Sequence, residues 1–121
     1  MKITVAKTAG FCFGVNRAVE TVNRLLDEGE KVWTLGPIIH NPQTLESLAA
    51  RGVRIAQTPE EARGGVLVIR SHGVARSVLE EAERGGVRYV DATCPFVAKI
   101  HRIVQQASEE GRFVLIAGDR T

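Results

Sequence analysis

The sequence has few cysteines, few aromatic residues and little net charge. Its 121 residues include two cysteines, one tryptophan and one tyrosine, and 16 basic and 14 acidic side chains leave a formal charge of +2. Because charges of both signs are interspersed, a clustered basic surface for nucleic acid is not expected. The longest uninterrupted apolar run, Phe113 to Ala117, is far shorter than the roughly 20 residues of a membrane span.

The N-terminus also lacks the features of an export signal. Lys7 follows Lys2 closely, where a signal peptide should have its apolar region. We therefore expect a cytoplasmic location. In a reducing compartment the two cysteines are not expected to form a structural disulfide, and they form no C-x-x-C pair.

What is present is sufficient for a folded domain. Hydrophobic residues make up 44% of the chain, and a domain of this length buries roughly two-thirds of the surface that its unfolded form exposes. The sequence shows no low-complexity tract, linker or internal repeat. We expect residues 1–121 to form a single domain.

Short β-branched segments alternate with helical patterns along this chain. The clearest helix is expected from Gly14 to Glu28, where apolar residues recur with a period of 3.6. Further helices are expected from Pro42 to about Arg51, briefly after Pro59, around residues 78–82, and from Pro95 to about Ala107. Strands are expected at Lys2–Ala6, Lys31–Leu35, Val53–Ala56, Val66–Ile69, Val87–Val90 and Phe113–Ala117. The alternation predicts an α/β fold, with a mainly parallel sheet flanked by helices.

The last four residues, Gly118 to Thr121, have the composition of a further strand-to-helix loop. No helix follows them in this sequence. We therefore expect the chain to be a domain excised from a longer protein.

Both cysteines and two of the three histidines fall in loops. Cys12, His40, His72 and Cys94 each follow a different expected strand. In open α/β sheets, ligands bind beyond the carboxyl ends of the strands, so these side chains are expected at one edge. This distribution favours a shared site over four unrelated core positions.

The cysteines could be inert buried thiols, but their settings favour a functional role. Cys12 and Cys94 each stand at the start of an expected helix, where the helix dipole favours the thiolate. Pro95 occupies the first helical position after Cys94. A thiolate there could bind a metal or attack an electrophile.

Three readings of the four side chains remain open. In the first, all four bind zinc, although zinc ligands usually occur in short-spaced pairs and these do not. In the second, the cysteines hold a softer iron–sulfur cluster while the histidines face a phosphate or diphosphate. In the third, the domain binds a phosphate ester and its cysteines are incidental. No P-loop or G-x-G-x-x-G motif is present to cradle a nucleotide.

Other candidates carry less information. His101 lies within an expected helix, and we interpret it as a surface residue without a catalytic role. Trp33 and Phe113 are expected in the cores of strands. Phe11 and Phe13 either shield the site around Cys12 or simply pack. Thr93 either donates a hydrogen bond near Cys94 or belongs to an ordinary strand exit.

Four segments carry a resemblance to a known family. They are Ala9-Gly10-Phe11-Cys12-Phe13-Gly14-Val15, Gly36-Pro37-Ile38-Ile39-His40-Asn41, Arg70-Ser71-His72-Gly73-Val74 and Asp91-Ala92-Thr93-Cys94-Pro95. In their order and spacing they resemble the N-terminal part of the LytB/IspH family, the 4-hydroxy-3-methylbut-2-enyl diphosphate reductases. The resemblance extends over essentially the whole sequence.

The resemblance implies an iron–sulfur oxidoreductase of the non-mevalonate isoprenoid pathway. Such enzymes remove the hydroxyl of an allylic diphosphate by a two-electron reduction and give isopentenyl and dimethylallyl diphosphate. Their 4Fe-4S cluster is held by three cysteines and leaves one iron open for the hydroxyl, and ferredoxin or flavodoxin supplies the electrons. By position, Cys12 and Cys94 match two cluster ligands, and His40 and His72 match histidines that bind the diphosphate.

The resemblance also implies that part of the site lies beyond Thr121. The third cysteine, another diphosphate-binding histidine, the glutamate proton donor and further polar residues of the pocket are expected there. The family fold has three related α/β domains around the cluster, and this chain resembles the first. No catalytic residue is expected within the 121 residues, which alone are expected to be inactive.

Overall fold

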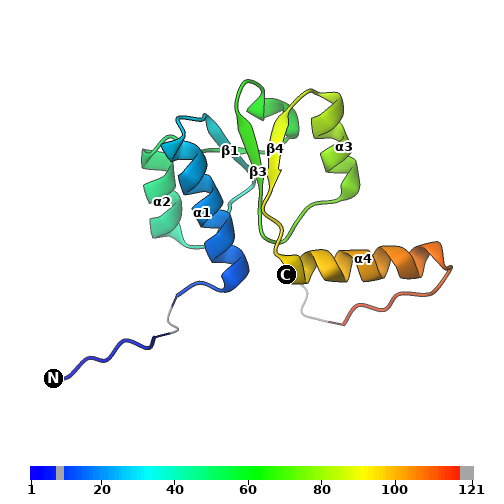
Figure 1. Ribbon diagram of the computed structural model, residues 1–121, viewed down its shortest axis with the longest axis horizontal. Helices are drawn as coiled ribbons and strands as arrows, with labels where there is room; N and C mark the ends of the chain where they lie inside the picture. The colour runs from blue at the N-terminus through cyan, green and yellow to red at the C-terminus, as the bar shows by residue number, and fades with distance from the viewer. Residues whose placement is uncertain (8–9, 118–121) are drawn as a thin grey trace.

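The computed structural model describes residues 1–7 and 10–117. Its centre is a four-stranded parallel sheet with the strand order β2-β1-β3-β4 (Figure 1). The strands are β1 (Val32–Leu35), β2 (Arg54–Ala56), β3 (Val66–Ile69) and β4 (Arg88–Asp91). Val68 of β3 is in register with Thr34 of β1 and with Val90 of β4. The predicted α/β fold with a parallel sheet is confirmed.

The helices also follow the sequence pattern. They are α1 (Phe13–Asp27), α2 (Pro42–Ala50), the short 3-10 helix η1 (Pro59–Ala62), α3 (Arg76–Arg84) and α4 (Pro95–Glu109). At the start of α2, the Asn41 side chain accepts a hydrogen bond of 2.9 Å from the Thr44 amide, and Pro42 takes the first helical position. None of the helices in residues 1–7 and 10–117 is both long and apolar enough to span a lipid bilayer.

Helices cover both faces of the sheet. On one face, α1 and α2 pack on Val66 and Val68 of β3, and on the other, η1 and α3 pack on Leu67 and Ile69. All four residues of β3 are therefore buried, as the continuous apolar run predicts for a strand covered on both sides. Trp33 packs at the edge of the second core, with the Arg54 guanidinium 5.3 Å from its ring centre.

Two expected strands do not form. Lys2–Ala6 and Phe113–Ala117 pair with no strand among the described residues, and Ile3 and Phe113 are 77% and 92% exposed. Figure 1 shows the first segment extending away from the sheet and the second running beside α4. Their β-branched and aromatic composition suits a strand, but a strand also needs a neighbour to accept its hydrogen bonds and cover its side chains. The loop expected at residues 118–121 lies outside the described residues.

Helix α4 differs from the other long helix. It leaves the sheet at Pro95, and none of its residues is buried, although Ile100, Ile103 and Val104 lie on the apolar face that the sequence predicts. The two faces of the sheet are instead covered by α1, α2, η1 and α3.

One close contact fixes the start of α1 against the start of α4. Gly14 is buried, and a Cβ atom at this position would lie 2.7 Å from Cβ and 2.8 Å from Sγ of Cys94. Only glycine permits this approach. The Cys94 side chain therefore lies directly on the first turn of α1. The contact is at Gly14, which follows Cys12 by two residues.

The doubly buried strand gives a first prediction. Leu67→Ala, at a fully buried position of β3, is expected to lower the free energy of unfolding by about 2–5 kcal/mol because it leaves a cavity. Leu115→Ala, at a position that is 83% exposed, is the matched control and is expected to change it by less than about 0.5 kcal/mol. Urea unfolding of the 121-residue chain measures both, and equal losses would contradict the assignment of the core.

The contact at Gly14 gives a second prediction. Gly14→Ala is expected to lower the free energy of unfolding by about 1–3 kcal/mol through overpacking, and to speed labelling of Cys94 by a thiol reagent. Gly85→Ala is the control, because the nearest atom to its Cβ would be the Glu81 carbonyl oxygen at 3.3 Å. Mass spectrometry of labelled peptides separates the two cysteines. Unchanged stability and labelling in Gly14→Ala would show that the contact is absent.

Candidate functional site

The four predicted side chains gather at the carboxyl ends of the strands. His40 lies in the loop after β1, His72 in the turn after β3 and Cys94 two residues beyond Ala92, after β4. Cys12 reaches the same edge by a different route from the one expected, because residues 1–7 form no strand before it. Helix α1 runs antiparallel to the strands, so its first residues lie at their carboxyl ends.

Cys94 is held in place through its backbone. Its amide donates a hydrogen bond of 2.9 Å to the carbonyl of Ser71, which is itself buried. Next to it, the Arg17 guanidinium of α1 donates to the Thr93 carbonyl at 3.0 Å. The side chain of Cys94 is 9% exposed and its thiol is free. These contacts join α1, β3 and the start of α4 around one thiol.

Cys12 is the exposed counterpart of Cys94. Each cysteine is the N-cap residue of a helix, Cys12 of α1 and Cys94 of α4, and neither side chain makes a capping hydrogen bond. Cys12 is a free thiol in the solvent-exposed part of the site. Neither sulfur atom is therefore engaged in a disulfide or a capping hydrogen bond, and both lie near the positive end of a helix dipole.

His40 and His72 form a pair. Their ring centres are 6.3 Å apart, and the planes are inclined at 36°. Both residues are exposed. His40 directly precedes the capped start of α2, and His72 lies in a turn closed by a 3.0 Å hydrogen bond from the Gly73 amide to the Arg70 carbonyl. Two imidazoles are thus presented to solvent from neighbouring parallel strands.

The structure brings His101 close to this turn, which the sequence reading did not expect. Gly73 has a φ of +74°, and a Cβ there would lie 2.8 Å from Cε1 of His101 and 3.2 Å from the Thr93 side chain. Thr93 in turn donates from both its amide and its hydroxyl to Asp91. His101 lies about two helical turns after Cys94, on the same side of the helix. This spacing in the sequence is the signal that could have placed His101 near the site.

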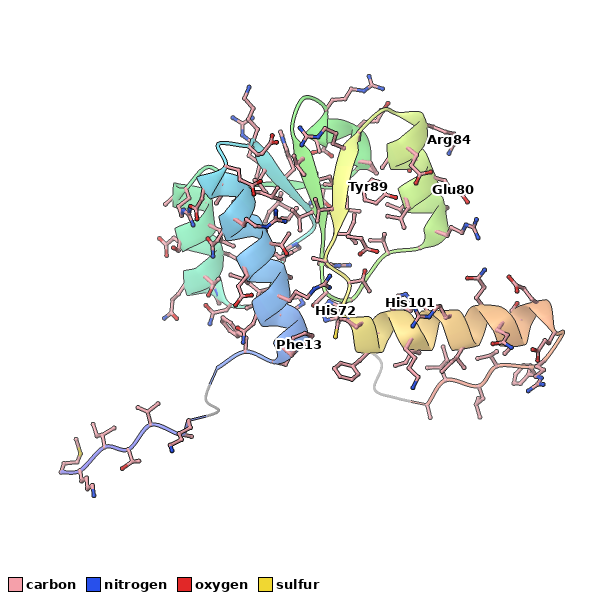
Figure 2. The ribbon with its side chains drawn as sticks, viewed as in Figure 1. Phe13, His72, Glu80, Arg84, Tyr89 and His101 are labelled. Atoms are coloured by element: carbon pink, nitrogen blue, oxygen red, sulfur yellow. The ribbon has the colours of Figure 1, made fainter. Side chains whose placement is uncertain are left out.

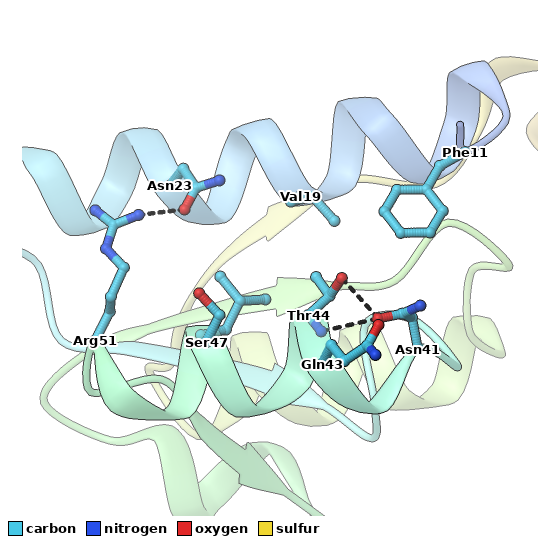
Figure 3. A pocket seen from close by; sticks show the side chains of 9 residues that line it. Phe11, Val19, Asn23, Asn41, Gln43, Thr44, Ser47 and Arg51 are labelled. Carbon is cyan, nitrogen blue, oxygen red and sulfur yellow. Dashed lines mark hydrogen bonds between the residues drawn. The ribbon is translucent and has the colours of Figure 1, made fainter. Parts of the chain in front are cut away.

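Two cavities adjoin the gathered loops. One of about 430 Å³ lies between α1 and α2, and Figure 3 shows Phe11, Asn41 and Thr44 at one end and Arg51 at the other. A wider groove of about 1070 Å³ lies between α3 and α4, with His72 and His101 among its lining residues (Figure 2). Phe11 therefore lines a cavity beside the Cys12 loop although it is partly open to solvent, and Phe13 is more exposed still.

One titratable group outside the site has a shifted pKa. The pKa of Tyr89 is raised because its hydroxyl donates a 2.9 Å hydrogen bond to the Glu83 carboxylate, with smaller contributions from burial and from the charges of Glu83 and Asp91. Figure 2 shows Tyr89 among the side chains near α3, away from His72. The phenol stays protonated at neutral pH and has no place in the site.

The arrangement discriminates between the metal readings. In the part of the chain that the structure describes, no three His, Cys, Asp or Glu side chains are grouped closely enough to hold one metal ion. This argues against zinc bound by Cys12, His40, His72 and Cys94 together. Two free thiols at neighbouring helix starts, with the glycine at position 14 leaving room for one sulfur, suit a thiolate-bound cluster that draws further ligands from elsewhere.

Comparisons with known proteins agree over nearly the whole chain. A model of the family described as LytB protein matches residues 3–121. The 4-hydroxy-3-methylbut-2-enyl diphosphate reductases of Geotalea uraniireducens and of a Thermoanaerobacter species are 47% and 43% identical to it, over 98% and 99% of the chain. The chain spans only 42% and 43% of the length of these two relatives.

Solved structures show the same fold. A structure of (E)-4-hydroxy-3-methyl-but-2-enyl diphosphate reductase matches 97% of this chain with a TM-score of 0.83 and 45% identity, and the match covers 42% of that structure. The corresponding reductase from Plasmodium falciparum matches 86% of the chain with a TM-score of 0.79 and 31% identity, over 33% of its length. The chain therefore belongs to the LytB family.

Proposed function

We propose that this chain forms part of a cytoplasmic 4-hydroxy-3-methylbut-2-enyl diphosphate reductase, as one α/β domain of residues 1–121. The observation that carries the proposal is the meeting of two free cysteines and a histidine pair at one edge of the sheet. The names of its relatives support the substrate class. The reaction would give isopentenyl and dimethylallyl diphosphate.

In this proposal, Cys12 and Cys94 are two thiolate ligands of a 4Fe-4S cluster. When bound, such a cluster supplies one electron at a time and an iron that can polarise a leaving hydroxyl. The chain contributes the positions of the two sulfur atoms. Gly14 holds Cys94 against α1, and the Ser71 carbonyl fixes the backbone of Cys94. Cys12 is the more accessible ligand.

His40 and His72 bind the diphosphate in this proposal. Imidazole N–H groups donate to anionic oxygens, and hydrogen bonds to a charged group are stronger than neutral ones. The two rings are 6.3 Å apart, so both can reach one diphosphate group. Their loops follow neighbouring strands, which fixes the direction in which the bound anion lies relative to the cysteines.

In this proposal, the electrons, the proton donor and the third cluster ligand come from outside these residues. Loss of the hydroxyl as water with reduction of the allyl group consumes two electrons and two protons. We assign the electrons to ferredoxin or flavodoxin. The third cysteine ligand and the glutamate proton donor are assigned to the part of the relatives' length that this chain does not span.

The cluster assignment gives a third prediction. The full natural chain that carries these residues, purified without oxygen, is expected to contain iron and acid-labile sulfide in similar amounts. Cys12→Ser and Cys94→Ser are each expected to lose most of both, because a thiolate ligand is removed. Ser77→Ala, at an exposed position of α3, is the control and should retain the parent content.

Iron and sulfide analysis with an anaerobic absorption spectrum measures this outcome. One equivalent of zinc without sulfide would instead favour the four-ligand zinc module. Pyrophosphate binding that neither serine variant changes, in a colourless protein, would favour the phosphate-ester-binding domain with incidental cysteines.

The histidine assignment gives a fourth prediction. His40→Asn and His72→Asn are each expected to raise KM for the diphosphate substrate about tenfold or more, because a charge-assisted hydrogen bond contributes about 1.5–3 kcal/mol. Steady-state reduction with a chemical reductant under anaerobic conditions measures this. Gln106→Asn, on an exposed part of α4, is the control. A lower kcat with an unchanged KM in both variants would contradict a role in binding.

A further inference from the structure

Arg70 has a buried hydrogen-bond donor without a partner. Its Nε atom is the one buried side-chain nitrogen or oxygen that makes no hydrogen bond in the described part of the chain. Arg70 follows β3 directly and stands two residues before His72. Because buried donors are nearly always satisfied, an exception indicates strain or a partner that is not among these residues.

The Arg70 side chain reaches the neighbouring strand. A Cβ atom at Gly36 would lie 3.1 Å from Nη1 of Arg70, so the guanidinium lies close to the backbone at this glycine. Gly36 has a φ of +69°, and its amide donates to the Ala56 carbonyl at the end of β2. It begins the loop that leads to His40. Arg70 therefore spans from the turn that carries His72 to the loop that carries His40.

The charge of Arg70 also has no carboxylate partner among the residues that the structure describes. No ion pair within residues 1–7 and 10–117 includes it. Asp91, at the end of the adjacent strand, accepts hydrogen bonds from Thr93 instead. A guanidinium stays charged throughout the physiological pH range. A half-buried, permanent cation without a carboxylate partner is costly by itself and suits a place where an anion binds.

We propose that Arg70 is a positioning residue of the anion site, which adds a fixed positive charge between the loop of His40 and the turn of His72 and keeps the two together. The inference rests on the proposed function, in which those histidines bind diphosphate. Arg70 does not contact the anion: it holds the two histidine segments together, and its charge adds to the attraction of the anion that the imidazoles contact. A neutral side chain of equal length would keep the packing but lose this attraction.

The test measures binding of inorganic pyrophosphate to the full natural chain by calorimetry. Arg70→Met is expected to weaken binding about tenfold or more, and Arg70→Lys, which restores the charge, should recover most of the loss. Arg84→Met is the matched control, because Arg84 is exposed and lies at the end of α3 farther from His72 (Figure 2). It should change binding less than about twofold.

Two results would overturn the proposal. One is binding to Arg70→Met that equals the parent. The other is an equal loss in Arg70→Met and Arg70→Lys, which would assign Arg70 a role in packing alone. If Arg70→Met does not fold, Arg70→Gln provides the same comparison. In folded variants, KM for the diphosphate substrate should rise with the pyrophosphate dissociation constant, while kcat changes less than about threefold.

The histidine variants separate this inference from the function on which it rests. If His40→Asn and His72→Asn bind pyrophosphate as the parent does, the proposed diphosphate site is wrong, whatever Arg70→Met does. If the histidine variants weaken binding and Arg70→Met does not, the diphosphate site stands and the role of Arg70 is wrong.

Discussion

Because all four residues of β3 are buried, helices must cover the sheet on both faces, and this requirement decides where α1, α2, η1 and α3 lie. Parallel strands cannot be joined by a tight turn, so each connection crosses a face of the sheet and returns to the same edge. The loops after β1, β3 and β4 therefore end up together. The position of His40, His72 and Cys94 is a consequence of hydrophobic burial in a strand that none of them belongs to.

Within that edge, small residues and backbone groups set the finer geometry. Gly14 lets Cys94 lie on α1, and Gly73 lets the turn with His72 fit beside His101 and Thr93. Gly36 lets the guanidinium of Arg70 lie close to the backbone of the loop after β1. In each case a Cβ atom would lie 2.7–3.1 Å from a side chain of another segment, so the packing of the site depends on three missing side chains as much as on those present.

Much of this was predictable from sequence, and the failures have a common cause. The period of 3.6 in residues 14–28 and the apolar run Val66–Ile69 predict α1 and β3, because local patterns reflect which face is buried. The same reasoning gave strands at Lys2–Ala6 and Phe113–Ala117, which pair with nothing among the described residues. Strand formation needs a partner that composition cannot reveal. His101 and Arg70 were missed because their importance lies in contacts across the fold.

The different exposure of the four predicted side chains argues for two kinds of chemistry at one edge. A zinc site would bring all four donors to one point at about 2 Å from the metal, and the described residues form no such group. Instead the Cys94 thiol is enclosed by α1 and the start of α4, while Cys12 and both imidazoles face solvent. In the proposed function, the enclosed Cys94 thiol would belong to the redox centre, and the exposed imidazoles would meet a charged ligand that must enter and leave. Because the loops that carry His40, His72 and Cys94 leave one rigid sheet, a diphosphate bound as proposed would stay at a fixed distance from the Cys94 thiol.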